Sequence, residues 1–359
     1  MKISSIRRRT LLSGTAAALA LPLLPNMATA QTKTLKLAWI RQFAPAGLVQ
    51  KEVELAKAEG LNVELIGFSR GLDGLVALQK GDAIAADCLI GYSQFFLALA
   101  QGIDVTMIAG SALGLNAILI NPRSLPKGQV DEKNKAYIGP EPWKQLAGKS
   151  VGMARGSQAE FLLRTFMKAH GMDLDKDAKF VDLKTNADQA LALQQGSIDV
   201  AVLVEPSATQ SRIAGHGVLL AYPYDAGPFT RLNSGLIVRT DALKQFPDEL
   251  QRLVRAHVKA IQFYQSDRSA LVSDTAKVTL FDAQAMTHLL NPQSLGLDPK
   301  YWLNMEFDNR LPKAAIELYA KNLFEAGGLQ KDVSREIGSH LDYSRLANAT
   351  KLSRTELGG

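Results

Sequence analysis

The chain has 359 residues, of which 47% are hydrophobic and 21% charged, so it can form one or two folded domains and is neither disordered nor fibrous. A single cysteine, Cys88, excludes an internal disulfide and a cysteine-rich metal or cluster site. The formal charge is +6, but residues 1–30 hold four basic residues and no acidic one. The remaining 37 basic and 35 acidic residues nearly balance, which argues against nucleic acid as a partner.

Residues 1–30 have the pattern of an export signal. Arg7-Arg8-Arg9 precede an apolar run over 11–24, and small residues at 28 and 30 suit cleavage after Ala30. The run is shorter than the roughly 20 residues of a membrane-spanning helix, and no later stretch is apolar for long enough. We therefore expect a soluble mature protein in a bacterial periplasm. Arg8-Arg9-Thr10-Leu11-Leu12 resembles the twin-arginine signature, with Leu11 where Phe is usual, which favours export after folding.

The first half of the mature chain alternates strands and helices. Runs rich in strand formers alternate with segments of helical spacing that stop at Gly60 and Gly81. The expected strands are 35–40, 63–66, 83–87 and 105–109, and the expected helices are 49–59, 72–79 and 92–99. Such alternation predicts a parallel sheet with helices on both faces.

The pattern then recurs, which predicts a second lobe of similar architecture. The expected strands are 150–154, 180–183 and 198–204, and the expected helices are 158–169 and 187–195. A further strand, 234–238, follows the turn-rich segment 222–228. Residues 77–81 and 192–196 share Ala-Leu-Gln-x-Gly at a separation of 115, and the strands that begin at Leu35 and Ser150 have the same separation.

Two segments rich in turn formers, 121–143 and 222–228, separate these regions and predict two crossings between hinged lobes. After Pro247 the pattern is almost entirely helical. The expected helices of this tail are 249–266, 270–280, 282–290, 299–310 and 312–326.

This order of motifs resembles the periplasmic solute-binding proteins of ABC importers, in the branch for sulfonates, nitrate, taurine and thiamine-precursor pyrimidines. The resemblance covers about residues 35–238. Its most specific parts are Leu146-Ala147-Gly148-Lys149, Arg155-Gly156-Ser157 and Gly196-Ser197-Ile198-Asp199, in that order. It implies an α/β fold of two similar lobes with mixed, mainly parallel sheets around a cleft, the type II periplasmic binding protein fold, with a helical C-terminal tail.

The resemblance also implies how the chain is divided and what it does. We expect a signal peptide over 1–30, a first lobe over 31–118 plus 232–359, and a second lobe over 119–231. The lobes are expected to close over a small anionic or zwitterionic organic solute and deliver it to a permease in the inner membrane. No enzyme activity, cofactor or metal is expected, and the protein is expected to be a monomer.

Ligands of open parallel sheets bind at the carboxyl ends of the strands, and this rule selects the candidate binding residues. The first lobe contributes Trp39, Arg41, Gln42, Phe68, Ser69, Arg70, Asp87 and Tyr92, and the second contributes Arg155, Ser157, Gln158 and Glu205. Arg41 and Arg70 suit bidentate binding of an anion, or are solvated surface arginines. Trp39 and Tyr92 either line the site or pack in the core.

Arg155-Gly156-Ser157-Gln158 is the sharpest of these elements, because a strand runs through Gly and Ser into a helix. The backbone N–H groups of the first helical turn are expected to be free and to favour an anion in the cleft. Ser157 either adds a hydroxyl to the site or caps its own helix.

Glu205 precedes Pro206 at the end of a strand, and two roles are open for it. It either pairs with Arg41, Arg70, Arg155 or Arg212 within the protein, or accepts a hydrogen bond from a cationic or N–H-bearing solute. An unpaired carboxylate would repel a simple anion, so the second role predicts a zwitterionic or heterocyclic solute.

Other functions are less well supported by the residues. Cys88 has apolar neighbours and no His or Asn partner nearby in sequence, so a buried structural thiol is expected. The five histidines have no metal-binding spacing, and no phosphate loop or Gly-x-Ser-x-Gly motif is present. A sensor that delivers its ligand to a receptor, or an enzyme on the same fold acting on a small heterocycle, are the alternatives to transport.

Overall fold

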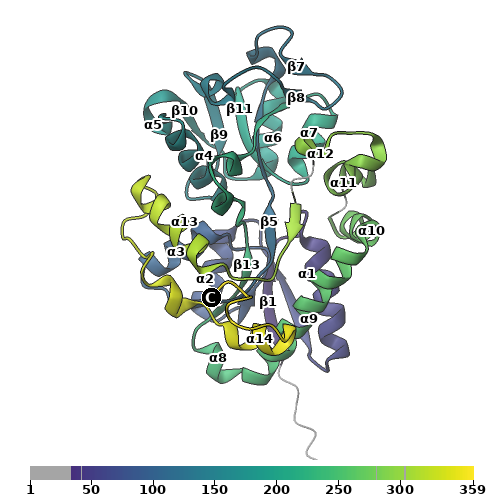
Figure 1. Ribbon diagram of the computed structural model, residues 1–359, viewed down its shortest axis with the longest axis vertical. Helices are drawn as coiled ribbons and strands as arrows, with labels where there is room; N and C mark the ends of the chain where they lie inside the picture. The colour runs from purple at the N-terminus through teal and green to yellow at the C-terminus, as the bar shows by residue number, and fades with distance from the viewer. Residues whose placement is uncertain (1–33, 42, 280, 303–304) are drawn as a thin grey trace, which may run out of the picture. The chain divides into compact units, whose positions relative to one another are not determined.

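The computed structural model describes residues 34–359 except 42, 280 and 303–304. The predicted export signal therefore lies outside the described residues. Two large β-sheets organise the described chain, and each carries helices on both faces (Figure 1). We call each sheet with its packed helices a lobe, and the sheet that contains the first strand belongs to the first lobe.

The five-stranded sheet of the first lobe contains the expected strands in a non-sequential order. Its order is β2 (Val63–Gly67), β1 (Leu35–Trp39), β3 (Ala85–Ala86), β13 (Gly235–Arg239) and β4 (Val105–Gly110). β1 pairs in parallel with β2 and β3, so the carboxyl ends of these three strands meet at one edge. Leu35 and Leu37 are buried beneath the helices, whereas Lys36 between them is exposed.

The second lobe has a seven-stranded sheet. Its order is β10 (Lys179–Asp182), β9 (Ser150–Met153), β11 (Val200–Val204), β6 (Asn116–Ile120), β12 (Val218–Ala221), β8 (Ala136–Tyr137) and β7 (Val130–Asp131). Apolar side chains fill both faces of this sheet, with Val151 and Val202 in one core and Ala201 and Leu203 in the other.

Both sheets are mixed, with parallel and antiparallel pairs in equal number among the described strands, rather than mainly parallel. β6 and β13 run antiparallel to both of their neighbours. These are the strands by which the chain enters the second sheet and returns to the first. They arrive without a helical crossover, which is the connection that parallel neighbours need.

The helices mostly agree with the expected segments, and α4 (Gln158–Ala169) has the predicted bounds. The first lobe has α1 (Ala46–Ala58), α2 (Gly71–Lys80), α3 (Tyr92–Ala100), α8 (Ala242–Gln245), α9 (Pro247–Ser266), α10 (Arg268–Thr279), α13 (Lys313–Glu325) and α14 (Tyr343–Thr350). The second lobe has α4, α5 (Leu174–Asp177), α6 (Asn186–Gln195) and α7 (Ser207–Ile213). Short 3₁₀ turns occupy Pro122–Ser124, Pro142–Leu146, Pro223–Ala226, Pro228–Arg231, Pro292–Leu295 and Ile337–His340.

The helix predicted over 299–310 is wrong. A short helix, α12 (Pro299–Trp302), is followed by the strand β14 (Met305–Phe307), which pairs antiparallel with β5 (Ala112–Gly114). Met305 and Phe307 are buried whereas Glu306 is half-buried, so the side chains alternate as in a strand.

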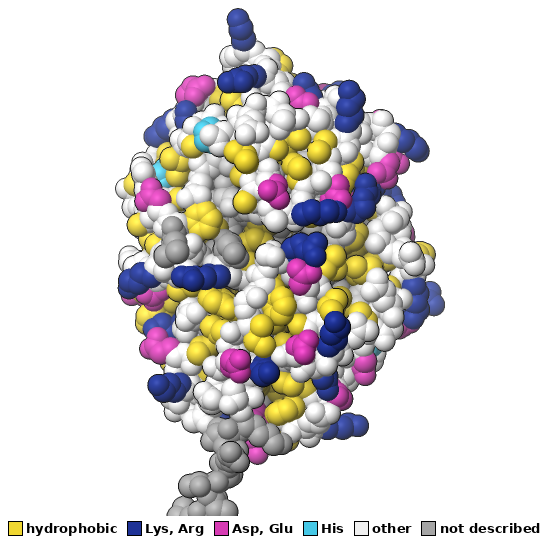
Figure 2. Space-filling view, turned by 180° about the vertical axis from the view of Figure 1, so that it is seen from behind, with side chains coloured by type: hydrophobic (Ala, Val, Ile, Leu, Met, Phe, Trp, Pro, Cys, Tyr) yellow, Lys and Arg dark blue, Asp and Glu magenta, His cyan; other side chains and the backbone are white. Residues whose placement is uncertain are grey.

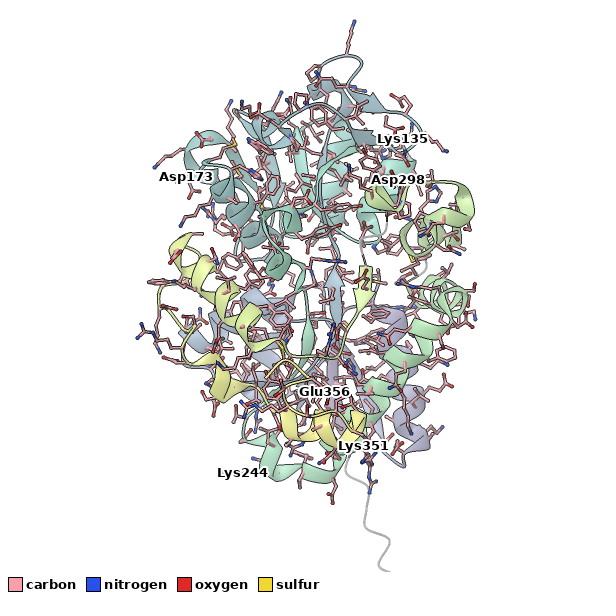
Figure 3. The ribbon with its side chains drawn as sticks, in the orientation of Figure 1. Lys135, Asp173, Lys244, Asp298, Lys351 and Glu356 are labelled. Atoms are coloured by element: carbon pink, nitrogen blue, oxygen red, sulfur yellow. The ribbon has the colours of Figure 1, made fainter. Side chains whose placement is uncertain are left out.

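Helices α11 (Ala283–Leu290) and α12 lie against the second lobe, and we call residues 283–302 the strap. The Arg212 guanidinium of α7 stacks over the Trp302 ring at 3.7 Å, and Tyr222 donates to the Tyr301 carbonyl at 2.8 Å. Figure 3 shows Asp298 beside Lys135, and the Asp298 N–H donates to the neighbouring Asn134 side chain. The elements on either side of the strap, α10 and β14, contact α1 and β5.

No helix in the described part of the chain has the length and apolar composition needed to cross a bilayer. Figure 2 shows acidic and basic side chains interspersed over one face of the molecule, which agrees with the near-balance of charge outside residues 1–30.

Candidate functional site

A cavity of about 140 Å³ lies between the two lobes, at the carboxyl ends of β3, β9, β10 and β11. Both lobes line it, as the rule for open α/β sheets requires. Its lining includes five of the residues selected from the sequence, namely Ser69, Arg70, Arg155, Ser157 and Gln158. Phe43, Leu72, Leu89, Ala154, Ala159, Val202 and Val204 give the cavity an apolar part.

Three basic side chains line the cavity, and no carboxylate does so among the described residues. Arg70 pairs with Asp73 at 2.7 Å, Arg155 with Glu160 at 3.6 Å, and Lys184 with Asp182. The Arg155 guanidinium also stacks over the Phe180 ring at 4.1 Å. All three basic groups are well exposed to solvent, and their partner carboxylates do not line the cavity.

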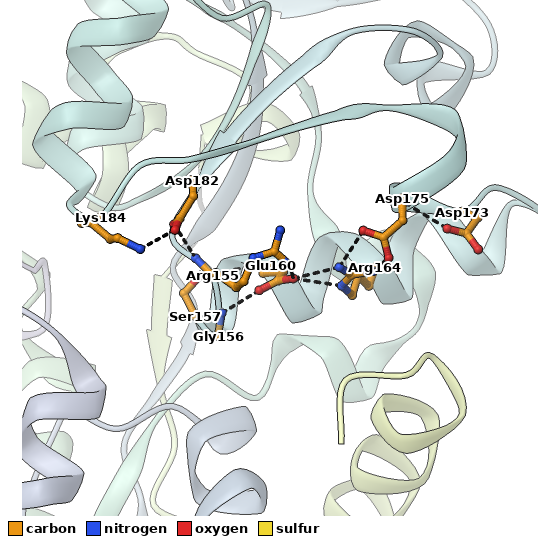
Figure 4. Close-up of polar contacts among 9 residues, drawn as sticks. All are labelled: Arg155, Gly156, Ser157, Glu160, Arg164, Asp173, Asp175, Asp182 and Lys184. Atoms are coloured by element: carbon orange, nitrogen blue, oxygen red, sulfur yellow. Dashed lines mark hydrogen bonds and ion pairs between the residues drawn. The ribbon is translucent and has the colours of Figure 1, made fainter. Parts of the chain in front are cut away.

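Carboxylates of the protein itself accept the two backbone N–H groups that lie just before the N-cap of α4 (Figure 4). The Gly156 N–H donates to Glu160 at 2.6 Å, and the Arg155 N–H donates to Asp182 at 3.1 Å. Ser157 accepts the N–H of Glu160 and so caps its own helix. Glu160 is buried and is also paired with Arg164 at 2.9 Å, which holds its carboxylate in place.

Buried carboxamides form the polar interior of the cavity. Gln158 accepts from the Ser93 N–H at 3.0 Å, and Gln94 accepts from the Gly91 N–H at 2.8 Å, so both cap the start of α3. Asn233 donates to Asn116 and to the Gly114 carbonyl, each at 2.8 Å. Because a carboxamide both donates and accepts hydrogen bonds without carrying charge, these side chains can bind either the donors or the acceptors of a polar solute.

Asp87 does not line the cavity and instead belongs to a buried cluster with Glu52 and His257. His257 Nδ1 lies 3.2 Å from Glu52 and 3.3 Å from Asp87. Burial raises the pKa of Glu52 to about 8. Burial also acts to raise the pKa of Asp87, but the charge and hydrogen bond of His257 outweigh it and lower that pKa to about 2. Asp87 also accepts the Cys88 N–H at 2.7 Å and the Ser111 hydroxyl, which ties it to the loop that lines the cavity.

Among the described residues, this cluster is the one group whose ligand atoms are close enough together to hold a metal ion. However, His257 Nε2 lies 2.7 Å from the Gly110 carbonyl, and Nδ1 faces two carboxyl groups. A ring with acceptors at both nitrogens is in its protonated form. The geometry therefore favours a charged hydrogen-bond network.

Glu205 is fully buried and lies outside the lining of the cavity. It accepts the Thr209 N–H at 3.0 Å, and its charge acts on the buried Arg212 guanidinium. Burial lowers the pKa of Arg212, and the charge of Glu205 opposes that effect. These contacts favour the scaffold role for Glu205.

The remaining candidate residues also lie away from the cavity lining. Trp39 and Tyr92 are buried in the first core, and Phe68 packs against that core. Arg41 is exposed and donates to the Val278 carbonyl at 2.8 Å. Gln42 lies outside the described residues.

Several lining residues were not selected from the sequence, and they fall into two groups. Lys184, Asn186 and Gln189 follow β10, and the carboxyl-end rule finds them once it is applied to that strand. Asn116, Asn233 and Ser234 precede or begin the antiparallel strands β6 and β13. The amino ends of these strands reach the cavity, and their direction was not evident from the sequence.

Cys88 lines the cavity and has a left-handed backbone with a φ of 52°. Its side chain is buried, and burial raises the pKa of its thiol well above the usual value. Because the thiolate is the reactive form, this cysteine is a poor nucleophile at neutral pH.

Comparison with known proteins identifies the fold and the family. Residues 28–280 match the sequence model of the NMT1-like family. No curated protein sequence matches the chain.

Solved structures share its fold at low sequence identity. The alkanesulfonate-binding protein of Xanthomonas axonopodis pv. citri bound to MOPS is similar with a TM-score of 0.68 and 16% identity, over 86% of this chain and 98% of that one. The periplasmic nitrate-binding protein of Synechocystis PCC 6803 is similar with a TM-score of 0.72 and 14% identity, over 91% of each chain. A Candida albicans protein with the generic periplasmic binding protein fold has a TM-score of 0.63 and 16% identity, over 86% of this chain and 96% of that one.

These similarities confirm the predicted fold class, with two α/β lobes around a cleft. The family model covers well over half of the chain, so the protein belongs to the NMT1-like family.

Proposed function

We propose that this chain is the periplasmic solute-binding component of an ABC importer, which captures a small organic anion and delivers it to an inner-membrane permease. Family membership, the shared fold of a sulfonate-binding and a nitrate-binding protein, and the cavity between the lobes support this function. The buried Cys88 thiol is held protonated, and this favours binding over covalent catalysis.

The positive charge of the cavity lining is the main support for the proposal. Arg70, Arg155 and Lys184 line one cavity, whereas their partners Asp73, Glu160 and Asp182 do not. An anion at this edge is attracted by three nearby cationic side chains and is not repelled by a carboxylate of the lining. Because Glu205 lies outside the lining, simple anions are favoured over solutes that require a buried carboxylate partner.

The size of the cavity suits a small solute. A dry cavity of about 150 Å³ accommodates a molecule of the size of benzene. The lining therefore suits a sulfonate, taurine, nitrate or related anion, with any hydrocarbon part against Phe43, Leu72 and Val202.

Closure of the lobes is the proposed mechanism of capture. The lobes are taken to comprise residues 31–118 plus 232–359 and residues 119–231, with the strap moving with the second lobe. The export signal over 1–30, of twin-arginine type, would bring the folded protein to the periplasm.

A thermal-shift screen of the mature chain tests the proposal. The screen contains alkyl sulfonates, taurine, nitrate, carboxylates, pyrimidines and MOPS, which carries both a sulfonate and a ring amine. We expect an anion to raise the melting temperature, and small-angle scattering with that anion to show a smaller radius of gyration than without it. A screen in which only uncharged pyrimidines stabilise the protein would contradict the proposed anion site.

Arginine variants then locate the site. Arg70→Ala and Arg155→Ala remove cations from the cavity edge, and each should weaken anion binding about tenfold, since a charged hydrogen bond contributes about 1.5–3 kcal/mol. Arg41→Ala is the matched control, because Arg41 is also exposed and follows β1 but donates to Val278. Equal effects of all three substitutions in calorimetric titrations would place the site elsewhere.

A further inference from the structure

The Gln158 side chain extends from the second lobe and forms hydrogen bonds with residues of the first lobe. Gln158 is the first residue of α4 in the second lobe, and its side chain is buried. Its amide oxygen accepts from the Ser93 N–H at 3.0 Å and from the Ser93 hydroxyl, at the start of α3. Its amide nitrogen donates to the Tyr319 hydroxyl at 2.9 Å and to the Leu232 carbonyl at 3.3 Å. All four contacts are made with groups of the first lobe or of the segment that returns to it.

The first lobe is shaped to receive this carboxamide. A Cβ on Gly91 would lie 2.8 Å from the Gln158 oxygen, so the glycine makes room for it. The N–H groups at the start of a helix lack partners within the helix and favour an acceptor, which here is Gln158. Two neighbouring N–H groups at this helix start are also satisfied by the protein, since Gly91 donates to Gln94 and Tyr92 donates to the Asn233 carbonyl.

Apolar contacts along α4 accompany the polar ones. Phe161 and Leu162 belong to the core of the first lobe, although α4 is a helix of the second. Lys168, further along α4, donates to the Glu325 carbonyl at the end of α13 at 2.6 Å. One face of α4 therefore joins the two lobes, and Gln158 is the end of that face nearest the cavity.

We infer that Gln158 is a positioning residue that shifts the equilibrium of the solute-free lobes toward their closed arrangement around the cavity. We call Gln158 and its partners Ser93, Tyr319 and Leu232 the Gln158 latch. The inference depends on the proposed closure of the lobes. When the closed arrangement is already populated, less of the solute's binding free energy is spent on closure, so the latch raises affinity in addition to any contact that Gln158 makes with the solute.

Small-angle scattering of the solute-free protein tests the latch directly. Gln158→Ala should increase the radius of gyration relative to the wild type, because the two lobes lose their shared hydrogen bonds. Gln158→Asn keeps the carboxamide but is one methylene shorter, and should expand in the same way. Gln189→Ala is the matched control. Gln189 is a buried glutamine of the same cavity, but it donates to the Leu183 carbonyl of its own lobe.

The expected result is expansion of both Gln158 variants and none of the control, with far-ultraviolet circular dichroism unchanged in all three. Expansion of the control to the same extent would show general loosening and overturn the inference. Unchanged scattering of the two Gln158 variants would also overturn it. Because no solute is present, this outcome is independent of whether the thermal-shift screen finds an anion.

A double-mutant cycle separates the latch from other effects of the substitution. Ser93→Ala removes the hydroxyl donor to Gln158, and its effect on affinity should be smaller after Gln158→Ala than in the wild type. For the anion that gives the largest thermal shift, Gln158→Ala should weaken binding about tenfold and mainly speed dissociation. Additive effects of the two substitutions would contradict direct coupling between these side chains.

Discussion

Ser157 and Glu160 show how side chains near a helix start bond to the backbone around it. Ser157-Gln158-Ala159-Glu160 has the spacing of a capping box, in which the third helical residue returns to the backbone at the helix start. This signal is present in the sequence and predicts a self-capped helix. Ser157 accepts the Glu160 N–H as in that motif, but Glu160 accepts the Gly156 N–H, and the Ser157 N–H donates to the Ala154 carbonyl.

Asp87 shows a second reason why the role of a single residue could not be predicted from the sequence. Its position after β3 correctly predicts that it lies near the cavity edge of the sheet. Its partners Glu52 and His257 come from α1 and α9, which are far away in sequence. Burial by distant helices cannot be read from local pattern, so the carboxyl-end rule selects Asp87 as a binding residue although its carboxylate is structural.

The buried cluster predicts how stability depends on pH. The folded pKa of Glu52, about 8, lies above its ordinary value of 4.5, so its contribution to stability is complete below 4.5 and is lost as the pH rises through 8. The pKa of His257 is raised because the nearby Asp87 and Glu52 outweigh burial, and it acts in the same direction. The depressed pKa of Asp87, about 2, gives a contribution that is lost only as the pH falls through that value.

Glu52→Gln removes the alkaline part of this dependence. The amide has the shape of the neutral acid and cannot ionise, so the variant should lose less melting temperature than the wild type between about pH 5 and pH 9. Glu54→Gln is the matched control on the same helix, because Glu54 is exposed and paired with Lys51. A Glu52→Gln curve parallel to that of the wild type would contradict the assignment.

At the scale of the element, long periodic segments were predicted well and short irregular ones were not. The bounds of α4 agree with the prediction, and α9 begins two residues earlier than the predicted start at 249. α7, β12 and α14 were not predicted, and each is eight residues or shorter. Periodicity needs several turns or alternations to be recognised, whereas short elements are fixed by the tertiary contacts around them.

The strap also depends on tertiary contacts, and the Trp302 ring anchors it to the second lobe. Trp302 is buried and stacks on the buried Arg212 guanidinium at 3.7 Å. Trp302→Ala should lower the free energy of unfolding by about 3–5 kcal/mol, since it removes a large buried side chain. Urea denaturation measures this change, with Lys300→Ala on the same short helix as the control. Equal midpoints for the two variants would show that Trp302 does not anchor the strap.

At the scale of the whole molecule, the twofold recurrence of strand and helix predicted two sheets around one cleft. The separation of 115 residues between the repeated pentapeptides corresponds to α2 and α6, which occupy equivalent places in the runs β1-α1-β2-α2-β3 and β9-α4-α5-β10-α6-β11. The direction of β6 and β13 was not predictable, because a strand that follows a crossing segment has no helical crossover to set its sense.

Helix α4 contributes to two hydrophobic cores at once. Leu163 and Phe166 pack in a core of the second lobe, whereas Phe161 and Leu162 pack in the core of the first. Unfolding of either core therefore removes packing from the other, and the strap is a second physical connection between the two lobes. Differential scanning calorimetry should give a single heat-absorption peak whose calorimetric and van't Hoff enthalpies agree. Two resolved peaks would mean that each lobe melts as an independent cooperative unit.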